Sequence, residues 1–274
     1  MSNNYSLFMK SIKSLYYHNP SVDGFEKMVL YYLKRGYHFV SIDELLRLLL
    51  FEKSIDEKLA FISFDDGWKG NLKLLPIIEK YKVPICIFVA TEPLTGGNFW
   101  WEFVSSYLGF KNMLQFKKLS YFEFYDKLIE IKSHVTLSRS ALTKDELIEL
   151  AKHPLVSIQS HTVNHPILTK TPDLILQSEL VDSKEILEEL TNNTVFAFSY
   201  PNGSLTSREV KMCKQYYKMA FTTEQRHIRL EDNLFLLPRY ALTGQYSRDL
   251  LKVWGIWKIL KKIVSILTFN IVKA

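Results

Sequence analysis

The sequence predicts an α/β fold built on a parallel sheet or a barrel. Short apolar runs that resemble buried strands recur along the chain, and segments with helical spacing alternate with them over some 220 residues. The chain has 274 residues, of which 47% are hydrophobic and 23% charged, which suits one large domain or two small ones and excludes disorder.

Helices are predicted from apolar spacing and from start signals. Residues 24–36 place Phe25, Met28, Val29, Tyr32 and Leu33 at helical spacing and end at Gly36. Further helices are expected at the capping boxes that start at Ser41 and Thr143, over about 70–81, and after Thr171, where Pro172 would be the first helical residue.

Strands are predicted where short apolar runs are bounded by turn residues. The run 59–64 is the clearest, because it is apolar throughout and ends abruptly in two aspartates and a glycine. The other expected strands cover residues 85–90, 155–159, 195–199, 219–222 and 235–239. Segment 98–140 breaks the alternation, so we interpret it as an insertion within a domain that covers residues 1–249.

The net charge, the cysteines and the first residues exclude only a few classes of function. A net charge of +6 suggests an anionic partner, but no nucleic-acid-binding motif is present, so nucleic acid is not expected. Cys86 and Cys213 do not form a disulfide framework. The first residues lack a basic stretch followed by an apolar one, which predicts a cytoplasmic location.

The segment 250–274 is predicted to be a basic amphipathic helix. Two readings stay open: a peripheral anchor at the inner face of the membrane, or a terminal helix packed on the domain with its lysines in water. Its apolar residues recur every three or four positions, at Trp254, Trp257, Leu260, Val264 and Leu267.

Two polar clusters follow predicted strands. Asp65 and Asp66 end the run 59–64, and His161 and His165 come directly after 155–159. Ligand sites of α/β folds gather at the carboxyl ends of strands. Two histidines four residues apart would converge on one face of a helical turn, the spacing that chelates a metal.

Two imidazoles and one carboxylate leave positions on a metal open for water and substrate. This ligand set predicts one divalent transition metal, with Zn²⁺ favoured and Co²⁺, Ni²⁺ or Fe²⁺ as alternatives. Such a metal polarises a carbonyl and lowers the pKa of water, which are the two requirements of amide hydrolysis.

These clusters resemble the first two motifs of the polysaccharide deacetylase family (NodB homology, carbohydrate esterase family 4). The residues are Ser63-Phe64-Asp65-Asp66-Gly67 and Ser160-His161-Thr162-Val163-Asn164-His165, and Phe198-Ser199-Tyr200-Pro201-Asn202-Gly203 resembles the third motif in a Tyr-Pro-x-Gly form. The resemblance covers roughly residues 20–245. It implies a distorted (β/α) barrel of the polysaccharide-deacetylase type, with a single metal in its mouth.

The resemblance also implies roles for individual residues. Asp65 would be the general base, and Asp66, His161 and His165 would be the metal ligands. The backbone N–H of Asn202 would stabilise the oxyanion of the tetrahedral intermediate. Tyr200 and Pro201 of the third motif would contact the substrate.

The chain departs from the family at two points. The arginine of the third motif falls on Ser199, and we expect that Arg239 could replace it from another strand. The late motif that usually supplies a histidine as general acid has no clear match, and His227 is expected to be a surface-loop residue.

We expect a metal-dependent N-deacetylase that acts on an N-acetylated amino sugar of a surface polysaccharide or its precursor, which could be lipid-linked. Trp100 and Trp101 could stack on a sugar ring or cover the core. Three alternatives stay open: a hydrolase of a non-sugar amide, a non-catalytic relative that binds metal and glycan, and a membrane-docking scaffold.

Overall fold

The computed structural model describes residues 11–254, which form an α/β fold with a curled, mainly parallel sheet. The sheet order β7-β6-β5-β4-β3-β1-β8 is parallel except for β8, with β2 added to β3 and β9 added to β1. The strands are β1 Ser11–Tyr17, β2 His38–Phe39, β3 Leu59–Asp66, β4 Ile85–Val89, β5 Val156–Ser160, β6 Ala197–Ser199, β7 Met219–Phe221, β8 Ile228–Arg229 and β9 Tyr240–Ala241.

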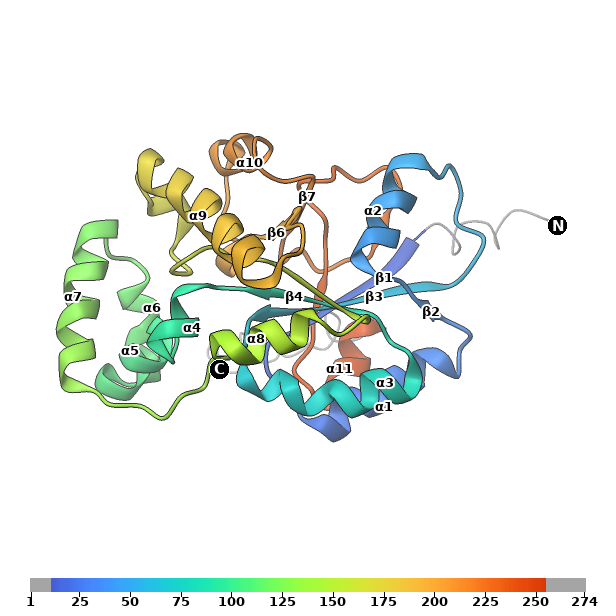
Figure 1. Ribbon diagram of the computed structural model, residues 1–274, viewed down its shortest axis with the longest axis horizontal. Helices are drawn as coiled ribbons and strands as arrows, with labels where there is room; N and C mark the ends of the chain where they lie inside the picture. The colour runs from blue at the N-terminus through green and yellow to red at the C-terminus, as the bar shows by residue number, and fades with distance from the viewer. Residues whose placement is uncertain (1–10, 255–274) are drawn as a thin grey trace, which may run out of the picture.

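Helices surround this sheet on both sides (Figure 1). The α-helices are α1 Val22–Leu33, α2 Ile42–Phe51, α3 Leu75–Tyr81, α4 Glu92–Gly96, α5 Trp100–Leu108, α6 Phe110–Phe116, α7 Tyr121–His134, α8 Lys144–Ala151, α9 Asp173–Thr191, α10 Ser207–Cys213 and α11 Tyr246–Val253. The short 3₁₀-helices are η1 Lys69–Leu74, η2 Leu168–Lys170 and η3 Pro201–Gly203. The predicted α/β barrel is confirmed.

The alternating side chains of β3 show how the core is divided. All eight residues of β3 are buried. Ala60, Ile62 and Phe64 point into the larger apolar cluster, whereas Leu59 and Phe61 belong to a second cluster with residues of β4, β6 and β7. Continuing along this second face, the side chains become polar at Ser63 and Asp65. Because side chains alternate along a strand, Asp65 is carried on the face that begins as apolar core.

The predicted strand at 235–239 is not a regular strand. Leu237 makes an isolated parallel bridge to Phe221 of β7, and a few residues later β9 pairs with β1. This stretch therefore connects one edge strand of the sheet to β1 and closes the gap between them. We call residues 234–242 the closing segment. It cannot form a longer strand because it crosses from one partner to another. Strand β1 was not predicted.

Two helix predictions need correction. The expected helix over about 70–81 begins as the 3₁₀-helix η1 and becomes α-helical only at Leu75. Pro172 is the N-cap of α9 with extended backbone and not its first helical residue, so α9 begins at Asp173. The capping boxes at Ser41 and Thr143 are present as predicted.

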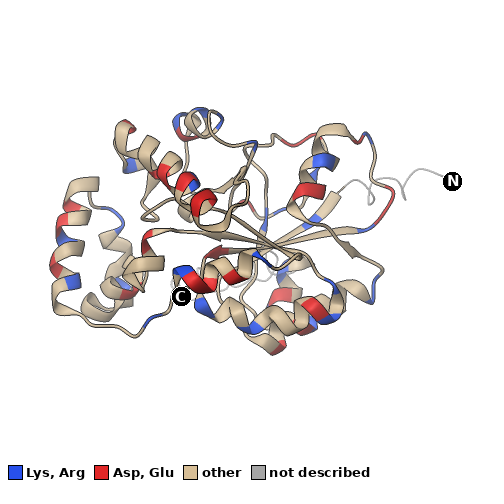
Figure 2. Ribbon diagram, in the orientation of Figure 1, with Lys and Arg blue, Asp and Glu red and all other residues tan. Residues whose placement is uncertain are grey.

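Segment 98–140 forms a helical lobe beside the barrel, made of α5, α6 and α7 (Figure 1). The lobe has a small core of its own, which consists of Trp100, Phe103, Val104, Phe116, Phe124, Leu128 and Ile131. Basic and acidic residues are interspersed along its outer helix α7 and along the helices around the barrel (Figure 2).

The predicted C-terminal amphipathic helix falls largely outside the described residues, because the description ends at Trp254. Within them, the Trp254 indole donates a hydrogen bond to the Tyr31 hydroxyl of α1. Among residues 11–254, no helix is long and apolar enough to cross a membrane.

Gly24 of α1 packs closely against the loop that precedes α11. A Cβ atom at Gly24 would lie 1.7 Å from the carbonyl oxygen of Gly244, on the loop before α11. Gly24→Ala should therefore lower the free energy of unfolding by about 1–3 kcal/mol, since backbone must move. Lys27→Ala, an exposed change on the same helix, should shift it by less than about 0.5 kcal/mol in the same urea titration. Equal effects of the two changes would contradict the close approach.

Candidate active site

The carboxyl ends of β1, β3, β5, β6 and β7 meet at one pocket with a volume of about 770 Å³. The strands run in parallel, so the residues that follow each of them gather at the same end. The pocket is lined by Tyr16, His18, Asp65, Asp66, Trp68, Trp101, Phe110, Met113, Lys117, His161, His165, Tyr200, Asn202 and Thr223.

Asp66, His161 and His165 form a buried cluster in this pocket. Their ligand atoms lie within 4.8 Å of one another. The Asp66 Oδ1 atom is 3.5 Å from Nε2 of His161 and 3.6 Å from Nε2 of His165. The Nδ1 atom of His161 is 2.7 Å from the carbonyl oxygen of Ser199, so Nδ1 donates and Nε2 keeps its lone pair for a ligand.

This donor set fits a divalent metal. Asp66 Oδ1 is buried without a hydrogen-bond partner, as expected of an atom that would bind a cation. Burial opposes ionisation of Asp66, but the imidazoles of His18, His161 and His165 hold its pKa well below the usual range. Burial lowers the pKa of His165 to about 3, so its imidazole is neutral, which is the form that binds metals.

Left-handed backbone is concentrated at this site. Six non-glycine residues among those described have positive φ. Lys82 and Asn192 end helices α3 and α9, where this conformation is common. The other four lie at the pocket or next to a residue that lines it: Asp66 (φ 78°), Thr162 (φ 73°), His165 (φ 53°) and Asn202 (φ 57°). Such strain persists only where surrounding contacts enforce it, and it is typical of functional sites.

The two histidines lie on a loop and not on the predicted helical turn. Residues 161–167 form no helix, and the left-handed Thr162 and His165 turn both imidazoles inward. The loop is held by Glu179 of α9, a carboxylate that is 2% exposed. Glu179 accepts hydrogen bonds from the Val163 N–H at 2.8 Å, the Asn164 N–H at 2.9 Å and the Asn164 side chain at 2.7 Å.

Arg239 from the closing segment pairs with Asp65. Its Nη1 atom donates to Oδ1 at 2.8 Å and its Nη2 atom donates to Oδ2 at 2.9 Å, which is a bidentate ion pair. Arg239 is fully buried. Burial opposes ionisation of Asp65, but the charges of Arg239 and His161 lower its pKa below the usual value. Asp65 is therefore a carboxylate at neutral pH.

Ser199 makes room for this arginine. The Arg239 guanidinium also donates to the hydroxyls of Ser63 and Ser199, and it lies 4.2 Å from the ring centre of Tyr16. The small residue at 199 thus accepts a hydrogen bond from an arginine that arrives from another segment.

The third motif forms a tight turn at the pocket. Tyr200 is buried but lines the pocket, whereas Pro201 is buried without lining it. Asn202 is exposed and left-handed, and its side-chain oxygen accepts a 2.6 Å hydrogen bond from Lys117 of the lobe. No contact identifies the Asn202 backbone N–H as an oxyanion donor, so that role stays a prediction.

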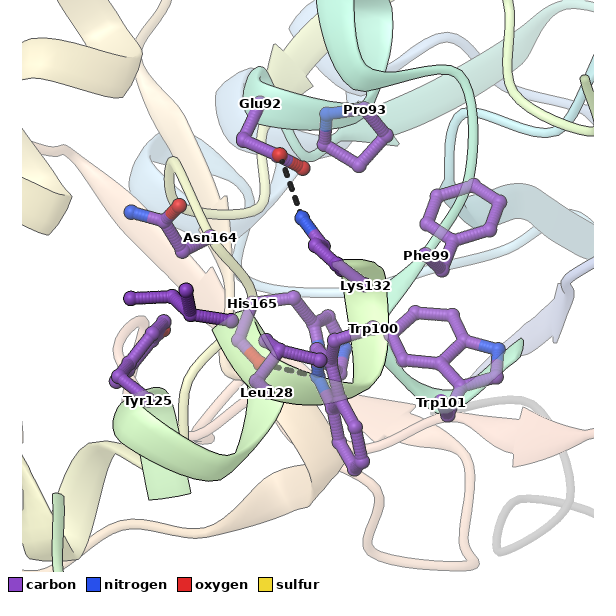
Figure 3. Close-up of a pocket in the computed structure, with 11 residues that line it drawn as sticks. Glu92, Pro93, Phe99, Trp100, Trp101, Tyr125, Leu128, Lys132, Asn164 and His165 are labelled. Carbon is purple, nitrogen blue, oxygen red and sulfur yellow. Dashed lines mark hydrogen bonds and ion pairs between the residues drawn. The ribbon is translucent and has the colours of Figure 1, made fainter. Parts of the chain in front are cut away.

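Trp100 and Trp101 of the lobe have different surroundings (Figure 3). Trp100 is 4% exposed, belongs to the lobe core and donates from Nε1 to the His165 carbonyl oxygen at 3.0 Å, so it is not free to stack on a sugar. It lines a cavity of about 110 Å³ that Trp101 and His165 also line, and it is not among the residues that line the larger pocket. Trp101 lines the metal pocket, and its ring centre is 4.7 Å from that of His165.

Seven pocket residues were not predicted: Tyr16, His18, Trp68, Phe110, Met113, Lys117 and Thr223. Trp68 donates from Nε1 to Asp66 Oδ2 at 2.8 Å, and its place two residues after Asp66 was the only sequence signal. His227 was expected on the surface. It lies in a loop but is half-buried against Tyr240, and burial lowers its pKa to about 3.

The sequence pattern that defines polysaccharide deacetylases matches residues 52–221, more than half of the chain. The chain belongs to the polysaccharide deacetylase family. This stretch contains both metal-site motifs and the third-motif turn, so the family match and the pocket geometry involve the same residues.

Named relatives extend the comparison. The chain is 25% identical over 225 residues to the polysaccharide deacetylase homologue YxkH of Bacillus subtilis. The match covers 81% of this chain and 65% of YxkH, so the chain spans less than two thirds of that relative. It is 22% identical to the poly-β-1,6-N-acetyl-D-glucosamine N-deacetylase of Staphylococcus aureus, over 92% of this chain and 77% of the other.

Solved structures show the same fold. The Streptococcus pyogenes deacetylase PplD, solved with acetate, superposes with a TM-score of 0.68 at 22% identity, over 89% of this chain and 98% of PplD. IcaB from Ammonifex degensii superposes with a TM-score of 0.65 at 18% identity, over 89% of this chain and 97% of IcaB.

Removing the Glu179 carboxylate should loosen the loop that carries His161 and His165. Glu179→Ala leaves buried N–H groups without an acceptor, so the free energy of unfolding should fall by at least about 2 kcal/mol. Metal affinity, measured by competition with a chelator, should fall about tenfold or more. Glu185→Ala, an exposed change on α9, is the matched control and should alter neither quantity. Unchanged metal affinity in Glu179→Ala would show that the loop needs no such support.

Weakening the contact between Arg239 and Asp65 should raise the pKa of Asp65. Lysine keeps the positive charge but cannot make the bidentate contact with Asp65. It therefore opposes the pKa-raising effect of burial less well than Arg239 does, and the pKa of Asp65 rises. In Arg239→Lys, the acidic limb of the kcat/KM profile for acetate release should move to higher pH. The exposed change Arg229→Lys should leave the profile in place. A shift to lower pH in Arg239→Lys would contradict the assignment.

Proposed function

We propose that this protein is a metal-dependent N-deacetylase that removes the acetyl group from an amino sugar of a surface polysaccharide or its precursor. The observation that carries this proposal is the pocket itself. It holds a candidate metal site beside a separate carboxylate, Asp65, whose ionised form is stabilised by Arg239. The name of the Staphylococcus aureus relative supports an N-acetylglucosamine polymer as the substrate class.

Asp66, His161 and His165 would hold the metal, with Zn²⁺ favoured by two imidazoles and one carboxylate. A bound divalent metal would polarise the acetyl carbonyl and lower the pKa of water. Asp65 lies in the same pocket as a carboxylate, and we assign it as the base that takes the proton from the attacking water. The turn at Asn202 would orient a backbone N–H toward the developing oxyanion.

His18 is the candidate for the missing general acid. It directly follows β1 and lines the pocket. Asp65 and Asp66 line the same pocket, so His18 shares the cavity with the proposed base and with one of the candidate metal ligands. It is not one of the three clustered metal ligands, so its imidazole is available to give a proton to the leaving amine.

The pocket favours this function over the alternatives. Its volume of about 770 Å³ exceeds what a small amide needs, and Trp68, Trp101 and Phe110 offer apolar surface for sugar rings. A base and a candidate acid that line the same pocket as the three candidate metal ligands argue against a non-catalytic relative. A cytoplasmic or membrane-surface location, and a lipid-linked substrate, remain proposals that rest on the sequence.

Acetate release tests the function. The metal-loaded protein should release acetate from N-acetylglucosamine oligomers, and Asp65→Asn should lower kcat about 10²–10⁴-fold because the base is lost. Asp56→Asn, an exposed change, should retain full activity. Full turnover by Asp65→Asn would exclude Asp65 as the base, and formate or ammonia release without acetate would favour a different amide substrate.

Loss of the His18 imidazole should impair the step in which the amine leaves. His18→Ala should lower kcat about 10²–10⁴-fold without changing metal affinity. His38→Ala, which alters an exposed histidine of β2, should leave kcat unchanged. If metal affinity falls together with kcat in His18→Ala, His18 belongs to the metal site and is not the acid.

A further inference from the structure

Lys117 reaches into the metal pocket from the helical lobe. It follows α6, lines the pocket and is half-buried. Its ammonium donates a 2.6 Å hydrogen bond to the side-chain oxygen of Asn202, on the other side of the pocket. The lobe and the barrel therefore meet at a lysine placed beside the third-motif turn.

The charge of Lys117 has no carboxylate partner at ion-pair distance among residues 11–254. The pocket's other charges are already used: Asp65 is paired with Arg239, and Asp66 lies against the two metal-site imidazoles. Elsewhere on the described surface, basic residues are interspersed with acidic ones (Figure 2). Lys117 thus adds a local positive charge to the pocket.

Holding a cation in a half-buried site is unfavourable unless a partner compensates for the lost water. Burial lowers the pKa of Lys117 from its ordinary value, which is the sign of this penalty. The amide oxygen of Asn202 is neutral, and the other neighbour, the Trp100 ring with its centre 5.6 Å from the ammonium, is also uncharged. A negative charge attracts an ammonium more strongly than a neutral group does, the more so where water is partly excluded. A bound anion would therefore be a better acceptor than Asn202.

We propose that Lys117 binds an anionic group, a phosphate or a carboxylate, on the glycan next to the N-acetylated sugar. Trp101 and Phe110 line the same pocket and would contact the sugar ring, while Lys117 would recognise the charged neighbour. The inference rests on the proposed sugar N-deacetylase function and specifies its substrate class as an acidic glycan. It also gives the lobe a role in substrate selection.

Binding measurements test this proposal without requiring turnover. Trp68 and Trp101 line the pocket, so their fluorescence should report occupancy. The metal-loaded protein would be titrated with N-acetylglucosamine 6-phosphate, with a hyaluronan tetrasaccharide as the carboxylate ligand, and with neutral di-N-acetylchitobiose. The variants are Lys117→Met, which removes the charge, and Lys117→Arg, which keeps it. Lys111→Met removes an exposed charge from the same helix and is the matched control.

We expect at least one acidic ligand to bind about tenfold tighter than the neutral one. Lys117→Met should abolish this preference, whereas Lys117→Arg and Lys111→Met should retain it. The ligand that loses affinity identifies phosphate or carboxylate as the recognised group. Equal affinities in the unaltered protein would overturn the proposal. So would a preference that survives in Lys117→Met, because the metal alone would then attract the anion.

Acetate release separates this inference from the proposed function. With an acidic oligosaccharide as substrate, Lys117→Met should raise KM about tenfold and leave kcat nearly unchanged. An equal fall in kcat on neutral and acidic substrates would mean that Lys117 orients Asn202 or stabilises the oxyanion, which contradicts substrate recognition. A charge preference in binding without any acetate release would retain the acidic ligand class and refute the deacetylase.

Discussion

The buried ion pair between Asp65 and Arg239 is the constraint on which the active site depends. Both side chains are nearly inaccessible to water, and each would be costly to bury alone. Asp65 ends the central strand β3, whereas Arg239 lies on the closing segment that links β7 to β1. The pair therefore forms only when the barrel has closed, so the ionised base and the complete fold arise together.

The candidate metal site shows a second dependence on the surrounding fold. Two of its three candidate ligands, Asp66 and His165, have left-handed backbone conformations. Contacts from distant elements hold this geometry: Glu179 binds the histidine loop, Trp100 binds the His165 carbonyl, and the Ser199 carbonyl orients His161. Helix α9, the lobe and strand β6 thus each position one part of the site.

The features that could be predicted from the sequence depend on residues that are close together in the chain. The apolar run of β3, the capping boxes and the four-residue spacing of the histidines depend on neighbours in the chain, and they identified the strand ends and the candidate ligands. The helical turn expected for His161 and His165 was wrong because Glu179, far along the chain, holds that loop in another conformation. The prediction of a strand at 235–239 was also wrong because of distant contacts. This stretch passes from β7 to β1 and pairs with each only briefly.

Residues that enter the pocket from distant segments gave little sequence signal. His18 follows a strand whose apolar and polar residues do not form a continuous run, and Lys117 is one of many lysines in the lobe. Their roles depend on how β1 and α6 pack at the mouth of the barrel. Arg239 was identified only because the family pattern required an arginine that position 199 lacks. The burial of Trp100 depends on the lobe core, which forms from residues up to some thirty positions away.

We propose that Asp66, His161 and His165 hold the metal on which deacetylation depends. The most direct measurement is the metal content of the purified, reconstituted protein by elemental analysis, with acetate release measured on the same samples. The account predicts about one transition metal per chain and acetate release from N-acetylglucosamine oligomers, with both lost in His161→Ala and His165→Ala. Metal content that is unchanged in these variants, or acetate release by the metal-free protein, would contradict it.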